Sequence, residues 1–137
     1  MGQAPTTARL VLASRLEDVP RAEQAVMDAV SRHGFDQSSC FAIKLAVEEA
    51  LINAIKHGNG GDESREIVVE INVSDKQACV GVTDEGVGFV PNGVPDPTLD
   101  ENLEKPNGRG IMLMRAYMNE VTFNEAGNCV TMIKQRR

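Results

Sequence analysis

The sequence has few cysteines, and none of them forms a CxxC pair. The three cysteines, Cys40, Cys79 and Cys129, are far apart and lie within apolar stretches. An odd number of widely spaced cysteines argues against a disulfide framework, and the absence of metal-ligand spacing argues against a zinc site. We therefore expect free, buried thiols in a reducing compartment.

Positive charge is also scarce, because the formal net charge of the chain is -6. Broad binding to a nucleic-acid backbone needs clustered Lys and Arg side chains that replace condensed counterions. The charge balance therefore argues against direct contact with nucleic acid. Any phosphate group that the protein binds has to be held locally.

Targeting and membrane-spanning segments are missing as well. The first residues, MGQAPTTARLVLAS, lack the basic start and the long apolar core of a signal peptide. No apolar run later in the chain approaches the length needed to cross a bilayer. We expect a soluble, cytoplasmic protein that does not bind a membrane.

What the sequence does contain is enough for one compact domain. The chain has 137 residues, of which 42% are hydrophobic, so it is long enough for one core and too short for two. We expect a single domain over residues 1–137. Residues 91–108 concentrate prolines and acidic side chains, which is typical of a long, exposed loop.

Helical spacing of apolar residues predicts two helices in the first half of the chain. The first runs from about residue 20 to 32 and ends at His33-Gly34, where we expect His33 to be a surface residue. The second starts at Asp36 or Ser38 and ends at Gly58, before a run of residues that adopt positive φ easily. A third helix is predicted within the stretch 107–118, where Gly108 and Gly110 precede it and Ile111, Met114 and Met118 repeat at helical spacing.

Alternating apolar residues predict strands at 9–14, 66–73, 78–83, 121–124 and 129–134. The second and third of these strands form one hairpin, and the last two form another. This order of elements predicts an α+β fold, a two-layer sandwich with helices on one face of a mostly antiparallel sheet.

The helix that contains AVEEALINAIKHG carries two unusual polar residues. Glu49 and Asn53 lie one turn apart on one face, beside small alanine side chains. Solvated helix faces normally carry Lys, Glu and Arg, whereas apolar residues fill both flanks of this one, with Phe41, Leu45 and Ile52 on one of them. These two side chains therefore indicate a binding or catalytic site.

Two glycine-rich turns complete a predicted site for a purine nucleotide. Asp84 follows a strand in DEGVGF, and its carboxylate can accept a hydrogen bond from the adenine amine, whereas guanine presents a carbonyl there. Backbone N–H groups around Gly108 to Met112, at the positive end of a helix, can hold phosphate oxygens. Short glycine motifs are weak alone, and the prediction depends on their combination.

The chemistry of Asn53 and Glu49 fits the phosphate end of such a site. The Asn53 carboxamide oxygen suits Mg²⁺, which prefers hard oxygen ligands and keeps waters and substrate phosphates in its shell. Glu49 is placed to accept a proton from an attacking hydroxyl or water. Lys56 and His57 lie near the helix end, where capping and a role in the site are equally compatible with the sequence.

Three motifs together resemble those of the GHKL ATPases. Glu49-x-x-x-Asn53-Ala54-x-x-His57-Gly58 resembles the N box, and Asp84-x-Gly86-x-Gly88-Phe89 resembles the first glycine box. Gly108-x-Gly110 resembles the second. The short chain and its closing GNCVTMIK are most similar to the stand-alone anti-sigma factor serine/threonine kinases.

The resemblance implies a Bergerat-type fold that binds ATP and Mg²⁺, with Glu49 as catalytic base, Asn53 as metal ligand and a lid at about residues 91–107. The implied nucleotide-binding residues are Asn53, His57, Asp84, Gly86, Gly88, Phe89, Gly108, Arg109, Gly110, Ile111 and Met112. It also implies a homodimer that phosphorylates a small anti-sigma antagonist and holds a sigma factor inactive. Asn128 replaces the Thr that many relatives carry after the glycine.

Two other functions are compatible with the sequence. A nucleotide-dependent binding module that sequesters a partner without phosphate transfer is one, although Glu49 argues against it. A structural domain without a ligand is the other, and it leaves Asp84 and both glycine turns unexplained. Met112, Met114 and Met118 are read mainly as core residues, with an adaptable contact surface as the alternative.

Overall fold

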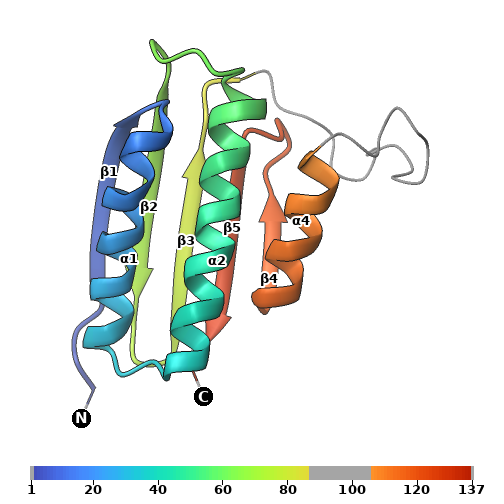
Figure 1. Cartoon of the computed structure of the whole chain (residues 1–137). Coiled ribbons are helices and arrows are strands. Elements are labelled where there is room, and N and C mark those ends of the chain that lie inside the picture. The colour runs from blue at the N-terminus through green and yellow to red at the C-terminus, as the bar shows by residue number, and fades with distance from the viewer. Residues whose placement is uncertain (1, 87–105, 137) are drawn as a thin grey trace.

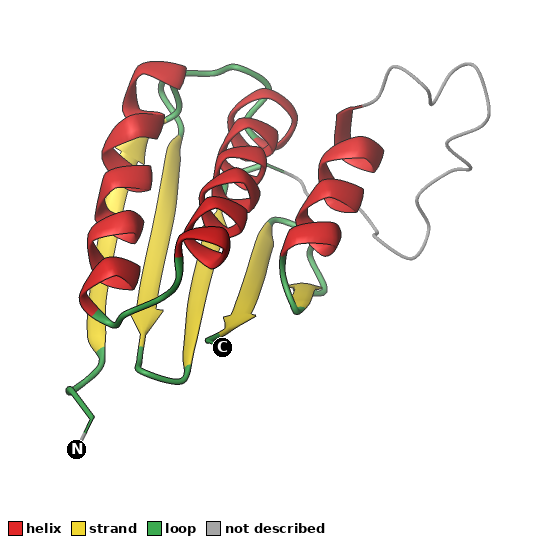
Figure 2. Ribbon diagram, turned by 60° about the horizontal axis from the view of Figure 1, so that its bottom comes forward, coloured by secondary structure: helices red, strands yellow, loops and turns green. Residues whose placement is uncertain are grey.

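The polypeptide forms two layers, a five-stranded sheet with the helices packed on one of its faces (Figures 1 and 2). The computed structural model describes residues 2–86 and 106–136, and for residues 106–109 only the backbone. The strands are β1 (Thr6–Ala13), β2 (Glu66–Val73), β3 (Gln77–Thr83), β4 (Glu120–Phe123) and β5 (Cys129–Gln135). The helices are η1 (Leu16–Asp18), α1 (Val19–Arg32), α2 (Gln37–Asn53), η2 (Ala54–Gly58) and α4 (Pro106–Tyr117).

The sheet has the strand order β1-β2-β3-β5-β4, and every described pair of neighbouring strands is antiparallel. In the centre of the sheet, Ile71 pairs with Val80, and Val80 pairs in turn with Met132. This register places apolar side chains from adjacent strands on the same face, toward the helices. The predicted α+β sandwich with an antiparallel sheet is therefore confirmed.

The core lies between this face of the sheet and the helices. The inward residues of β2 are buried, whereas Glu70 and Asn72 between them face the other side. Helix α2 contributes Ile43 and Leu51, both fully buried. Full burial of one such side chain contributes about 1.5–3 kcal/mol to folding. Alternation in the strands and helical spacing in α2 thus determine how the two layers pack.

Glycines mark the ends of elements where the sequence predicts them. Gly34 after α1 has φ 74°, and Gly127 in the turn between β4 and β5 also has φ 74°. Positive φ strains residues with a Cβ atom, so glycine is favoured at both places. Strand β1 starts three residues earlier than predicted, at Thr6 rather than Arg9, because pairing with β2 continues past the apolar run.

His33 is buried, and the prediction of a surface position is wrong. Only 2% of the residue is exposed. Its Nδ1 lies 2.7 Å from an Asp75 carboxylate oxygen and its Nε2 lies 2.9 Å from the Thr6 hydroxyl. These partners come from β1 and from the turn between β2 and β3, so spacing within α1 could not reveal them.

The cysteines and the start of the third helix also differ from expectation. Cys40, Cys79 and Cys129 are free thiols, as predicted, but they are partly exposed rather than buried. Helix α4 begins at Pro106, so Gly108 and Gly110 lie inside the helix instead of preceding it. Proline is favoured in a first turn because its fixed φ suits the helix and its missing N–H is not needed there. Within residues 2–86 and 106–136, no helix is long and apolar enough to cross a membrane.

Candidate functional site

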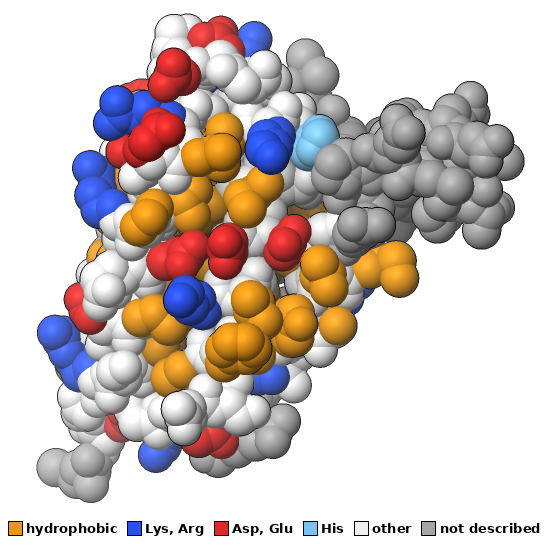
Figure 3. Space-filling model, viewed as in Figure 1, with side chains coloured by type: hydrophobic (Ala, Val, Ile, Leu, Met, Phe, Trp, Pro, Cys, Tyr) orange, Lys and Arg blue, Asp and Glu red, His pale blue; other side chains and the backbone are white. Residues whose placement is uncertain are grey.

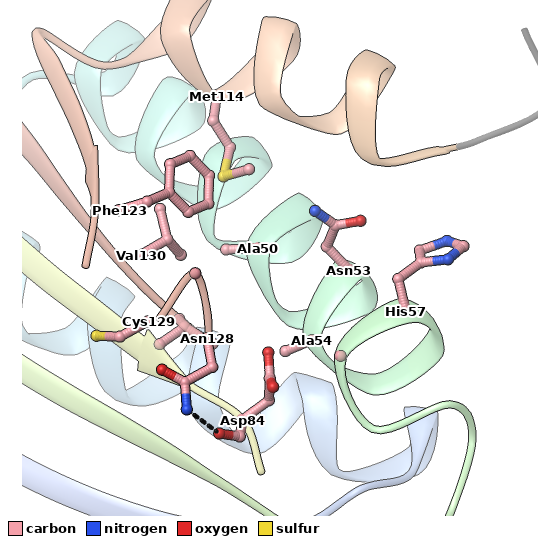
Figure 4. A pocket seen from close by; sticks show the side chains of 13 residues that line it. Ala50, Asn53, Ala54, His57, Asp84, Met114, Phe123, Asn128, Cys129 and Val130 are labelled. Carbon is pink, nitrogen blue, oxygen red and sulfur yellow. Dashed lines mark hydrogen bonds between the residues drawn. The ribbon is translucent and has the colours of Figure 1, made fainter. Parts of the chain in front are cut away.

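A cavity lies beside α2, where β3 ends and where α4 and the turn between β4 and β5 approach the helix (Figure 4). Its volume is about 70 Å³. The lining residues are Ala50, Asn53, Ala54, His57, Gly58, Val82, Asp84, Met114, Phe123, Gly127, Asn128, Cys129 and Val130. Pockets for small molecules usually measure about 300–1,000 Å³, so the cavity accommodates a purine-sized fragment only if the site opens further.

Asp84 is the acidic residue of this cavity. It follows the last residue of β3, and its carboxylate points toward Ala54 of η2 (Figure 4). One carboxylate oxygen accepts a hydrogen bond from the backbone N–H of Gly86 at 2.7 Å. Partial burial raises the pKa of Asp84 above its usual value, and the hydrogen bond from the Gly86 N–H partly offsets this effect. A partly buried acceptor therefore faces the cavity, and its recognition of an exocyclic amine stays a prediction.

Gly58 and Gly86 allow the Asp84 turn to lie directly against the end of α2. A Cβ atom at Gly86 would overlap the backbone carbonyl oxygen of Gly58, and a Cβ atom at Gly58 would overlap the Asp84 carboxylate. Both glycines are therefore required by close approach. The helix end widens into a π turn there, with the N–H of Asn59 donating to the carbonyl of Ala54 at 2.8 Å.

Asn59 fastens the same turn and was not identified from the sequence. Its side chain is almost fully buried, with 2% of the residue exposed. The carboxamide oxygen accepts a hydrogen bond from the N–H of Glu85 at 2.8 Å, and the amide group donates to the Ser14 hydroxyl and to the carbonyl of Glu66. Asn59 thereby connects the Asp84 turn to the end of β1 and the start of β2. Its position in GNGG suggested only a turn residue.

Glu49 and Asn53 lie next to the start of α4. A Cβ atom at Gly110 would be 3.6 Å from a Glu49 carboxylate oxygen and 3.8 Å from the Asn53 carboxamide, so the α4 backbone passes close to both side chains. Neither side chain has a hydrogen-bond partner among the described residues. Asn53 also lines the cavity, whereas Glu49 lies beside it. The two polar groups are thus free to contact a ligand at the α4 end.

The start of α4 at Pro106 changes which backbone N–H groups are available to contact a phosphate. The first N–H groups of a helix have no acceptor within the helix, and in α4 these belong to residues up to Arg109. The N–H groups of Ile111 and Met112 are within the helix instead. The Ile111 side chain is buried, and Met112 is 67% exposed. Met114 and Met118 are core residues, in agreement with the expectation for two of the three methionines.

His57 and Asn128 form two further edges of the cavity. His57 comes from η2, and its pKa is lowered by partial burial and by the adjacent charge of Lys56. The side-chain amide of Asn128 donates to the backbone carbonyl of Asp84 at 3.4 Å, and the Asp84 N–H donates to the Asn128 carbonyl at 2.9 Å. Asn128 therefore holds the Asp84 strand end through its backbone and side chain, whereas a threonine would present a hydroxyl.

Some expected site residues lie outside the described part of the chain. These are Gly88, Phe89 and nearly all of the predicted lid at residues 91–107. In the other direction, Phe123 and Cys129 line the cavity and were interpreted from the sequence only as strand residues. Their inclusion follows from the pairing of β4 with β5 next to β3, which period-two spacing alone does not specify.

Among the described residues, no group of three or more His, Cys, Asp or Glu side chains is placed to hold a metal ion. As far as the described residues go, a metal ion bound through Asn53 would take its other ligands from bound phosphates and water. Mg²⁺ accepts such a shell, since it keeps several waters and commonly takes one or two protein oxygens.

Comparisons with known proteins agree with this fold. Residues 12–134 match the family model described as the histidine kinase-like ATPase domain. The chain is 30% identical over 132 residues to a Listeria monocytogenes protein named serine-protein kinase RsbW, covering 91% of this chain and 84% of that protein. It is 32% identical to the Bacillus subtilis protein of the same name, covering 76% of this chain and 69% of the relative.

A Clostridium perfringens protein named anti-sigma F factor is 31% identical, with 69% of each chain covered. Among solved structures, a Mycobacterium tuberculosis protein with RsbU and RsbW domains matches with a TM-score of 0.65 at 18% identity. That match covers 96% of this chain and 32% of the longer one. At this identity, the structural likeness is informative about the fold alone.

Proposed function

The chain belongs to the histidine kinase-like ATPase domain family, among the anti-sigma factor serine/threonine kinases, and from this premise we propose that it is itself an ATP- and Mg²⁺-dependent protein kinase. Its substrate is a small anti-sigma antagonist protein. When it is not bound to the antagonist, it sequesters a sigma factor, and it acts as a homodimer. Relatives named serine-protein kinase and anti-sigma factor support this proposal.

The observation that carries the proposal is the placement of Asp84, Asn53 and Glu49 around one end of α2. The Asp84 carboxylate faces a cavity whose wall requires glycine at positions 58 and 86. Asn53 lines that cavity and Glu49 lies beside it, and neither has a hydrogen-bond partner in the described part of the chain. Asp84 as the acceptor for the adenine base, Asn53 as the metal ligand and Glu49 as the proton acceptor thus lie in this order alongside α2. This order fits ATP and Mg²⁺.

Each residue then has a defined role. Asp84 accepts a hydrogen bond from the adenine amine, supported by Gly86, and His57, Gly88 and Phe89 complete the base and sugar end. Backbone N–H groups in the first turn of α4, around Gly108 and Arg109, bind phosphate oxygens. Gly110, Ile111 and Met112 follow that turn, and Gly110, which has no side chain, leaves room beside Glu49.

Asn53 would hold Mg²⁺, and Glu49 would accept the proton from the seryl or threonyl hydroxyl of the antagonist. When bound, ATP supplies the γ-phosphoryl group and Mg²⁺ neutralises charge on the phosphates. As the hydroxyl oxygen forms its bond to the γ-phosphorus, the bond to the bridging oxygen breaks and ADP leaves. The residues of this chain position the hydroxyl and remove its proton.

The experiment that tests this function mixes the purified protein with ATP, Mg²⁺ and a candidate antagonist encoded by the same organism. Intact-mass spectrometry should show one added phosphate on a serine or threonine of the antagonist. Omission of Mg²⁺ should abolish the product. Tight ATP binding without any phosphorylated antagonist would instead favour a binding module that sequesters its partner.

A further inference from the structure

The outer face of α2 and α4 exposes large apolar side chains next to Glu49. Phe41 of α2 is 62% exposed and Met112 of α4 is 67% exposed. Leu45, one turn after Phe41, is half-buried on the same side of α2. Met112 follows Gly110 by two residues, and the Gly110 backbone lies close to Glu49. Leu45 thus lies one helical turn before the proposed proton acceptor, Phe41 lies one turn further along the same helix, and Met112 is exposed on the neighbouring helix.

Acidic side chains interrupt this apolar surface. Figure 3 shows a band of acidic groups that crosses the outer face of α1 and α2, with apolar side chains on both sides of it. Partial burial raises the pKa of Glu23 of α1, and the nearby negative charge of Glu48 of α2 raises it further. Lys44 lowers it. Neither Glu23 nor Glu48 forms a salt bridge within the described part of the chain.

We propose that Phe41, Leu45, Glu48, Glu23 and Met112 form a docking surface for the phosphoacceptor protein, which binds it through a Lys or Arg side chain placed beside an apolar one. The inference rests on the proposed kinase function. For proton transfer, the acceptor hydroxyl must come within about 3 Å of the Glu49 carboxylate. The body of a partner in that position covers the neighbouring surface of α2.

Charge complementarity selects this occupant. An apolar contact buries Phe41 and Met112, and a basic group compensates Glu23 and Glu48, which would otherwise lose water without a partner. A second copy of this chain fits less well, because its net charge is -6. The chain's own segment at 91–108 is also acidic, so it is repelled by the same carboxylates.

The test measures phosphorylation of the purified antagonist by two variants, Phe41→Ala and the double variant Glu23→Gln/Glu48→Gln. Neither changes a residue assigned to the nucleotide site. We expect KM for the antagonist to rise at least about fivefold in each, as for side chains that contribute strongly to an interface. The ATP dissociation constant and kcat should stay unchanged. Added NaCl should raise KM more in the wild type than in the double variant.

Matched controls are Val11→Ala, an exposed apolar residue on the opposite face of the sheet, and Glu63→Gln, an exposed carboxylate after η2. Both should leave KM unchanged, and thermal unfolding should show that all variants are folded. Unchanged KM in both surface variants, while the wild type phosphorylates the antagonist, overturns the docking surface alone. Absence of transfer by the wild type overturns the kinase function and the docking surface with it.

Discussion

The carboxamide oxygen of Asn59 accepts a hydrogen bond from the backbone N–H of Glu85 at 2.8 Å. This bond joins the end of the helix that carries Glu49 and Asn53 to the turn that carries Asp84. The two parts of the proposed nucleotide site, which come from distant segments of the chain, are thereby held at a fixed separation.

Asn59→Ala should therefore weaken both stability and nucleotide binding. It leaves the Glu85 N–H and the Glu66 carbonyl without their partner, which costs about 1–3 kcal/mol of unfolding free energy. Urea denaturation and calorimetric titration with ATP measure the two effects. Ser14→Ala, which removes a different partner of Asn59, is the control and should reduce stability without weakening ATP binding at a temperature where both variants are folded.

Gly86→Ala should abolish ATP binding, because its Cβ atom would overlap the backbone carbonyl of Gly58. Gly58→Ala should destabilise the fold less than Gly86→Ala does, because its Cβ atom would displace the Asp84 carboxylate rather than a backbone carbonyl. Gly81→Ala is the matched control: its Cβ atom would meet no atom closer than 3.9 Å. Equal ATP affinity for Gly86→Ala and Gly81→Ala would contradict the close approach.

Asp84→Asn should reduce the preference for ATP over GTP, because the amide group can donate to the guanine carbonyl that the carboxylate disfavours. Competition between the two nucleotides for a fluorescent ATP analogue measures the ratio. A ratio equal to that of the wild type would place base recognition elsewhere.

Asp84 also predicts a dependence of stability on pH. Its pKa is raised in the folded protein, so the folded state binds more protons than the unfolded state, and this contribution to stability is lost as pH rises through the raised pKa. Asp84→Asn should therefore gain stability relative to the wild type between acidic and neutral pH. Unfolding curves for both proteins across that range should diverge in this direction, and parallel curves would contradict the burial of Asp84.

His33→Ala should destabilise the fold by about 2 kcal/mol or more without changing ATP affinity. The substitution leaves a cavity and removes hydrogen bonds to Thr6 and Asp75. These residues lie at the end of the sheet away from Asp84. A loss of ATP affinity in folded protein would show that this end of the molecule communicates with the nucleotide site.

The sequence predicts the parts of this structure that depend on local spacing. Alternation over residues 66–73 and 78–83 predicts a hairpin that ends at Asp84, and helical spacing places Glu49 and Asn53 on one face. What local spacing does not show is contact between distant segments. His33 meets Asp75, 42 residues away, so its burial was missed.

The same reason explains the other differences at the site. Asn59 meets Glu85 across 26 residues, and nothing in GNGG distinguishes a buried network from a turn. The start of α4 at Pro106 was placed too late because its glycines suggested a loop. Phe41 was expected to fill an apolar flank of α2, but its side chain is largely exposed, because neither α1 nor α4 covers this part of the helix.

The most direct test of the kinase proposal is a comparison of Glu49→Gln with the wild type in phosphate transfer to the antagonist and in ATP binding. Glu63→Gln serves as the control. Removal of a general base lowers the rate roughly 10²–10⁴-fold, and the substitution should leave ATP affinity almost unchanged because Glu49 contacts the hydroxyl rather than the nucleotide. Transfer at the wild-type rate by Glu49→Gln would contradict the assignment of Glu49 as the proton acceptor.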